Sequence, residues 1–274
     1  MKCPQFILQP LRRVEQESRA FLASNAGRRV DRKVIVILVV AALCLTVQRY
    51  VAQVDTLAAQ GRWLHRLGWD RAGDFLIDLG REAPETRAGQ LVWWACVTLL
   101  VNVAVPMLLI RLVFREQLRD YGLKLRGAFA DYWVYFAFLA VAAPLVFLAS
   151  AGERFQEKYP YYDVTFDGGL SSAFWRWEVL YAVQFFGVEF FYRGFLLHGL
   201  KLRFGAYAIL VMMVPYCMLH FTKPLPETLA AIVGAIVLGF MSLRTRSIWM
   251  GTAIHITVAG LMDLTSLWRK GLLF

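Results

Sequence analysis

The chain of 274 residues is too apolar for a soluble globular domain, since 58% of its residues are hydrophobic and its mean hydropathy is +0.49. Its formal net charge of +10 does not indicate a nucleic-acid-binding face, because the basic residues stand in short segments between apolar runs. The pattern predicts an all-α, polytopic membrane helical bundle of about seven transmembrane helices, within a range of six to eight, whose partner is the lipid bilayer and no nucleic acid.

The N-terminal segment is basic. Residues 1–33 carry eight Lys or Arg against three acidic residues, which predicts a cytoplasmic N-terminal arm at the membrane surface. No early apolar run of a cleavable signal peptide is present, so the first apolar run, at about residues 34–52, is expected to stay in the protein as a span.

Residues 34–120 are expected to hold the first two spans with an outer interfacial segment between them. The second span is expected at about 91–110, with a kink at Pro106. In the intervening segment, residues 62–79 alternate apolar and charged side chains at near-helical spacing. This spacing indicates a helix that lies in the membrane interface.

Residues 121–274 are expected to form the membrane core that carries the chemistry. The Lys and Arg bias of alternate connections places the N-terminus in the cytoplasm, and we expect a bacterial-type inner (plasma) membrane. Seven spans then leave Arg269 and Lys270 outside, as an exception to that bias. The five spans of the core are expected at about 132–150, 177–200, 204–221, a stretch that ends near 242, and 248–267.

The span at 177–200 carries Glu189 and Arg193 near its middle. Ionisable side chains are rare at membrane depth, and the i, i+4 spacing places both on one helix face. A structural salt bridge is one interpretation. Two later spans carry His220 and His255, however, and a carboxylate with two imidazoles can activate water and stabilise an oxyanion.

Glu189-Phe-Phe-Tyr-Arg193, Tyr216-Cys-Met-Leu-His220 and His255 resemble the three motifs of the CAAX-protease and bacteriocin-processing family of intramembrane proteases. This family includes the type II CAAX prenyl endopeptidases, and the resemblance covers roughly half of the chain. It implies an endopeptidase that hydrolyses a peptide bond of a membrane-associated protein or peptide. It also implies that Glu189, Arg193, His220 and His255 form the catalytic site.

Three positions depart from the family pattern. Val188 stands where the family has its first glutamate, which is usually given the water-activating role, while Glu189 matches the second. Tyr216 replaces a phenylalanine, and Ala259 stands where an asparagine is common. The valine leaves open a catalytically inactive scaffold or an immunity-type partner protein. A proton-coupled transporter is a third alternative, which the lack of inverted repeats disfavours.

In an active enzyme, Glu189 is expected to be the base, because its span offers no other carboxylate at that depth. For this role the helix must be rotated or bulged near Gly187, so that the carboxylate points at His220. Arg193 is expected to hold the carboxylate, and His255 to steady the oxyanion. A metal-free mechanism is favoured, with Zn²⁺ held by the histidines and a carboxylate as the alternative.

Two further carboxylates are expected to lie outside this chemistry. Glu178 is predicted to be an outer-interface residue, about 16 Å from Glu189 along the helix. Asp263 is predicted to be solvated at the same interface. The cysteines have no paired spacing, which indicates neither a disulfide nor a metal site at Cys3, Cys44, Cys96 and Cys217.

Overall fold

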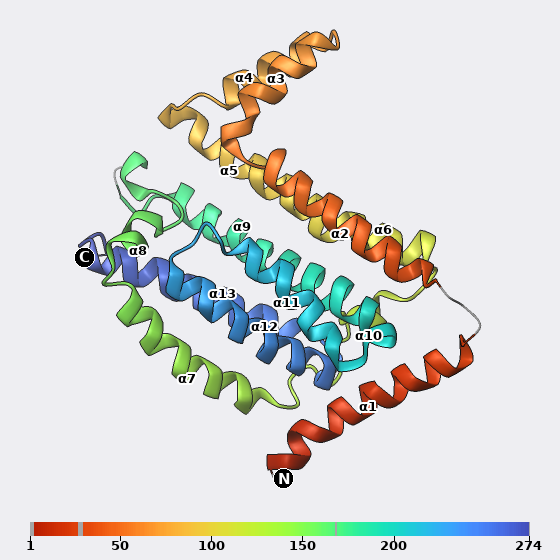
Figure 1. Cartoon of the computed structure of the whole chain (residues 1–274). Coiled ribbons are helices and arrows are strands. Elements are labelled where there is room, and N and C mark those ends of the chain that lie inside the picture. Colours follow the sequence, from red (N-terminus) through yellow and green to blue (C-terminus); the bar gives the residue numbers. More distant parts are fainter. Residues whose placement is uncertain (1–2, 27–29, 168, 274) are drawn as a thin grey trace.

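The computed structural model describes residues 3–26, 30–167 and 169–273 as a helical protein (Figure 1). Its α-helices are α1 (Cys3–Ser24), α2 (Arg32–Tyr50), α3 (Leu57–Arg66), α4 (Asp70–Leu79), α5 (Pro84–Leu99), α6 (Val105–Leu108), α7 (Tyr132–Ala149), α8 (Glu153–Lys158), α9 (Ser172–Glu189), α10 (Gly199–Phe204), α11 (Ala208–Leu219), α12 (Leu225–Thr245) and α13 (Trp249–Arg269). The predicted all-α fold class is confirmed.

Within the described residues, six helical stretches are long and apolar enough to cross a membrane: Arg32–Tyr50, Glu85–Val113, Tyr132–Ala149, Ser172–Leu219, Leu225–Thr245 and Trp249–Arg269. The fourth stretch contains 48 residues and reverses direction after α10 (Figure 1). The reversal falls at Gly205, whose φ of 55° suits a residue without a Cβ. This stretch therefore supplies two of the seven predicted passages, and the chain is an integral membrane protein.

The chain segments between spans are held at both ends of the bundle by cationic side chains. Helix α1 lies across one end, where the Arg244 guanidinium binds both carboxylate oxygens of Asp131 at 2.7 and 3.0 Å. The same guanidinium donates to the Phe6 carbonyl at 3.2 Å and lies 3.8 Å from the centre of the Phe6 ring. One side chain of α12 therefore fixes α1 and the start of α7.

At the opposite end, Arg269 and Lys270 connect the C-terminal end of α13 to the end of α7 and to the loop that follows α8. Arg269 donates to the Ser150 hydroxyl at 2.7 Å and to the Phe147 carbonyl at 3.0 Å. Lys270 donates to the Tyr159 carbonyl at 2.6 Å. These cations satisfy carbonyl groups that the end of α7 and the following loop leave without helical partners.

Helices α3 and α4 form a hairpin that projects away from the bundle at a steep angle to α2 (Figure 1). Its helices meet closely, because a Cβ on Gly61 would lie 2.5 Å from the Gly73 carbonyl oxygen. His65 on α3 binds Asp70 at 3.0 Å and Asp74 at 3.1 Å on α4. Residues 62–79 therefore form two short helices where the sequence pattern predicts one, and they break at the Gly68 turn.

Two of the spans leave the α-helical pattern. Around Pro106, π-helical turns flank α6 at Leu100–Ala104 and Leu109–Val113. Proline lacks the N–H that an α-helix needs, so the predicted kink appears as a distortion of the hydrogen-bond pattern. A longer π-helical segment, η6 (Phe190–His198), continues α9 directly after Glu189.

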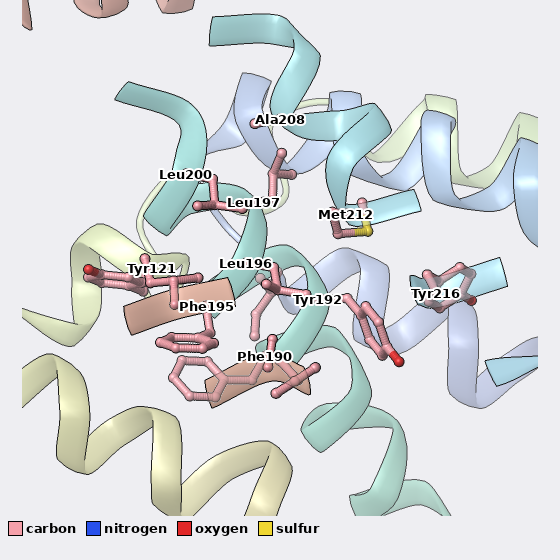
Figure 2. Close-up of a cluster of buried hydrophobic side chains, with 14 of the residues drawn as sticks. Tyr121, Phe190, Tyr192, Phe195, Leu196, Leu197, Leu200, Ala208, Met212 and Tyr216 are labelled. Carbon is pink, nitrogen blue, oxygen red and sulfur yellow. The ribbon is translucent and has the colours of Figure 1, made fainter. Parts of the chain in front are cut away.

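The π-helical segment η6 forms the centre of the core (Figure 2), and all nine of its residues are buried. Its aromatic side chains pack with Tyr121, Met212 and Tyr216. Gly194 allows the chain to come close to the segment before α7, because a Cβ there would lie 2.8 Å from the Tyr121 carbonyl oxygen. Helix α9 is held to α5 by a buried hydrogen bond from Gln184 to the Ala95 carbonyl, 2.7 Å. The thiols of Cys44, Cys96 and Cys217 are free, and the Cys3 side chain lies outside the described part.

We expect Arg244→Lys to lower the free energy of unfolding by about 2 kcal/mol, because an ammonium cannot reproduce the two-pronged contact with Asp131. The measurement is the thermal unfolding midpoint of the detergent-solubilised protein. Arg126→Lys, at an exposed position before α7, is the matched control. Equal midpoints for the two variants would show that the Arg244 contact does not stabilise the fold.

Candidate functional site

Glu189 ends helix α9 with a fully buried carboxylate. One oxygen, Oε1, lies 3.0 Å from Nη1 of Arg193 and 3.0 Å from Nδ1 of His255. The arginine is one turn further along the same span, whereas the histidine comes from α13. The structure thus brings three of the four predicted site residues into direct contact.

Arg193 is also fully buried, in the π-helical segment η6. Its guanidinium carbon lies 4.1 Å from the centre of the Tyr216 ring, so the cation is stabilised by an aromatic face as well as by the carboxylate. The ion pair with Glu189 uses a single nitrogen. Among the described residues, Nε, Nη1 and Nη2 of Arg193 and Oε2 of Glu189 have no hydrogen-bond partner, so the contact of Nη1 with Oε1 is an ion pair without hydrogen-bond geometry. The pair is therefore an open one, rather than the closed bidentate arrangement.

His255 is held at both ring nitrogens. Its Nδ1 faces Glu189, and its Nε2 lies 3.3 Å from the Tyr216 hydroxyl. An ionised carboxylate only accepts hydrogen bonds, so Nδ1 carries the proton of the neutral ring and Nε2 keeps a lone pair. The tilted ring of Phe185, with its centre 4.8 Å from that of His255, packs against the imidazole and fixes it further.

His220 follows the end of α11, and it is tied to the same tyrosine. Its Nδ1 lies 3.0 Å from the Tyr216 carbonyl oxygen, and the two ring centres are 4.8 Å apart. The carbonyl accepts, so Nδ1 of His220 is the donor. The sequence predicts that Glu189 points at His220, but the carboxylate contacts His255. The reason is that α13 packs directly beside α9, while Tyr216 lies between the two histidines.

Gly251 is a site residue that the sequence did not reveal. A Cβ at this position would lie 2.7 Å from Oε2 of Glu189, so the carboxylate occupies space that any other residue would fill. Gly251 precedes His255 by four residues and shares its face of α13. The only signal in the sequence was this spacing of a glycine and a histidine.

Val188, at the position of the missing family glutamate, is partly buried and packs against the apolar core that contains η6. A rotation or bulge of the helix was expected near Gly187. The helix instead changes from the α to the π hydrogen-bond pattern directly after Glu189. A Cβ on Gly187 would lie 3.3 Å from Leu99 on α5, so this glycine permits close helix packing.

The prediction for Asp263 was wrong. Its side chain is buried rather than solvated, because the loop after α8 folds over this part of α13. The Tyr161 backbone N–H donates to the carboxylate at 3.0 Å, and the Glu178 carboxyl group lies close enough to interact with it. Glu178 is partly buried on α9. Its interaction with Asp263 connects α9 to α13 at a place away from Glu189.

The donor set does not match a zinc centre. Within the described residues, no group of three or more His, Cys, Asp and Glu side chains is placed to hold a metal ion. Zinc needs at least three protein ligands around an open position. Both histidine Nδ1 atoms face acceptors, and Nε2 of His255 faces a hydroxyl. We therefore derive no step through a metal.

We expect Gly251→Ala to displace the Glu189 carboxylate and to weaken its contact with His255. Loss of a hydrogen bond to a charged group costs about 2 kcal/mol, whereas alanine gains up to about 1 kcal/mol in helix propensity. The expected net effect is a free energy of unfolding lower by about 1 kcal/mol, measured by thermal unfolding in detergent.

Gly260→Ala is the control on the same helix, since a Cβ there meets nothing within 4 Å. This variant is expected to be neutral or slightly more stable. A Gly251→Ala protein as stable as the Gly260→Ala protein would contradict the tight fit of Glu189 against α13.

Comparison with known proteins agrees with this geometry. Residues 170–261 match the family model described as type II CAAX prenyl endopeptidase Rce1-like, and the matched segment contains all four predicted site residues. No match was found among the curated proteins. The solved structures gave no match either. The resemblance seen in the sequence is thereby confirmed over residues 170–261, and this segment is similar to the CAAX-protease family.

Proposed function

We propose that this chain is an intramembrane endopeptidase, which hydrolyses a peptide bond of a membrane-associated protein or peptide by means of a water molecule activated by a glutamate–histidine pair. The observation that carries the proposal is the 3.0 Å contact between the Glu189 carboxylate and Nδ1 of His255, which links two spans. A carboxylate on one imidazole nitrogen orients the ring and favours proton uptake at the other.

In this proposal Nε2 of His255 is the base, and Glu189 acts through it. Arg193 neutralises the carboxylate, so that the buried charge does not need water. His220 is the second imidazole. Its Nδ1 donates to the Tyr216 carbonyl, so Nε2 of the neutral ring keeps a lone pair that can orient the attacking water.

The description of the matched family supplies the first substrate class to test, a peptide in which a prenylated cysteine is followed by three C-terminal residues. The basic residues at the α1 end of the bundle support a cytoplasmic N-terminus in a bacterial-type inner membrane. On this orientation the substrate approaches from within the bilayer or from its cytoplasmic interface.

A second candidate is a catalytically inactive scaffold or an immunity-type partner protein. It is favoured by the complete burial of Glu189 and by the apolar packing of Val188 at the position of the family's first glutamate. Such a protein would keep the Glu189–Arg193 pair to lock the spans together. A folded wild-type protein that cleaves no peptide would support this alternative.

We expect the wild-type protein in lipid nanodiscs to cleave members of a fluorogenic peptide library, with prenylated and unprenylated cysteine peptides compared directly. His255→Gln and Glu189→Gln are expected to lower kcat by about 100-fold or more, since the first removes the imidazole base and the second removes the carboxylate that acts through it. His65→Gln, on the α3–α4 hairpin, is the matched control and is expected to retain activity. Wild-type rates in the Glu189→Gln protein would exclude the glutamate–histidine pair.

The rate is expected to fall as the pH drops toward 4, because burial lowers the pKa of His220 to about 4 and its neutral ring is the form that orients the water molecule. His220→Gln should leave a slow reaction without this acidic limb, as measured from kcat between pH 4 and pH 7. Retention of the acidic limb in His220→Gln would remove His220 from this role.

Val188→Glu tests the inactive alternative directly. If the native protein is a degenerate protease, restoring a carboxylate at this position is expected to create peptide cleavage in a protein that otherwise has none. The same assay and library provide the measurement. Val183→Glu is the control for adding a carboxylate to α9, because Val183 is exposed on the same helix.

A further inference from the structure

Tyr216 is the residue through which the two histidines are connected. Its carbonyl accepts from Nδ1 of His220 at 3.0 Å, and its hydroxyl lies 3.3 Å from Nε2 of His255. Its ring lies beneath the Arg193 guanidinium, at 4.1 Å, and the side chain is almost completely buried. One residue of α11 thus contacts three of the predicted site residues.

The direction of the hydrogen bonds in this chain follows from the donor inventory. Glu189 can only accept, so it receives the Nδ1 proton of His255. A neutral imidazole with its proton on Nδ1 can only accept at Nε2, and the Tyr216 hydroxyl is the group that faces this lone pair. The hydroxyl therefore donates to His255, and its own oxygen keeps lone pairs for a further donor.

We infer, on the basis of the proposed function, that the Tyr216 hydroxyl is a catalytic group that passes the proton of the attacking water to His255. The arrangement is a carboxylate–imidazole–hydroxyl chain formed by Glu189, His255 and Tyr216. It has the connectivity of a hydrolase triad. Its hydroxyl carries a proton, whereas the hydroxyl of a serine triad attacks the substrate.

The step balances as follows. An O–H bond of water breaks, and its proton goes to the Tyr216 oxygen while the original Tyr216 proton goes to Nε2 of His255. The hydroxide forms the new bond to the carbonyl carbon, and the carbonyl electron pair moves to oxygen. When this pair returns, the C–N bond breaks and the leaving amine takes the proton that Nε2 of His255 received, so that His255 is neutral again. The sum is one water and one peptide bond converted to an acid and an amine.

A purely structural role for Tyr216 predicts something different. The ring provides the cation–π contact with Arg193, the tilted contact with His220 and the packing in the core, and a phenylalanine would keep all three. The hydroxyl also interacts with the Arg193 guanidinium, which a phenylalanine would lose. Tyr192 gives a matched comparison (Figure 2). It is a buried neighbour whose ring meets that of Tyr216 edge-on at 5.2 Å, and its hydroxyl lies 3.5 Å from the Pro215 carbonyl.

The first test compares Tyr216→Phe with Tyr192→Phe in the nanodisc cleavage assay. We expect Tyr216→Phe to lower kcat by about 100-fold, as for loss of a proton-transfer group, with KM changed less than about threefold. Tyr192→Phe should stay within about threefold of the wild type in both constants. A Tyr216→Phe protein with wild-type kcat would overturn the inference.

The second test does not depend on activity. The chain contains four histidines, so ¹⁵N-histidine spectra of the protein in nanodiscs can be assigned with single His→Gln variants. Tyr216→Phe is expected to shift the Nε2 signal of His255 toward that of an unbonded imidazole nitrogen, and Tyr192→Phe to leave it unchanged. An unchanged signal in Tyr216→Phe would refute the hydroxyl contact.

The two tests separate this inference from the proposed function. Wild-type cleavage that survives Tyr216→Phe refutes the proton transfer through tyrosine and leaves the endopeptidase standing. A wild-type protein without cleavage refutes the endopeptidase and with it the catalytic role of the hydroxyl. In that event a shifted His255 signal would still establish the hydrogen-bonded chain.

Discussion

The structure depends on the way in which one buried carboxylate is neutralised inside a membrane span. An unpaired charge at that depth would cost several kcal/mol, and Glu189 has no access to water that could reduce this cost. The protein supplies a cation from the same span and an imidazole from α13. These contacts fix the position of α13 against α9. Glycine is then the only kind of residue that fits at the position of Gly251, between the two helices.

The sequence was sufficient to predict the architecture and to propose the ionisable residues of the site, because both depend on hydropathy and on ionisable residues at membrane depth. The spans and the Glu189–Arg193 pair follow from such one-dimensional patterns. The partner of Glu189 does not, because helix order in the chain does not determine which helices touch. The π-helical segment η6 was also beyond prediction, since it is selected by close packing at positions such as Gly194 rather than by composition.

The burial of Asp263 shows the same limit at the outer end of the bundle. Its place near the end of a span suggested contact with solvent, and no local pattern could reveal that the backbone of Tyr161 would cover it. Long-range contacts made by loops have no periodic signature. The same limit applies to the site, because the departures from the family pattern at Val188 and Tyr216 can be interpreted only when both are considered in the structure. The chain lacks one carboxylate and presents a hydroxyl to the histidine that the remaining carboxylate holds.

The π-helical segment η6 has a consequence for how this gene can vary. A π-helix forms when an α-helix accommodates an inserted residue, and such insertions often persist at functional sites. In η6, loss of one codon would allow the α-helical pattern to return and would change the angle at which the buried residues of this segment stand relative to Glu189. Arg193 and the buried aromatic residues would then face other neighbours. In-frame deletions should therefore be purged from the nine codons that follow Glu189.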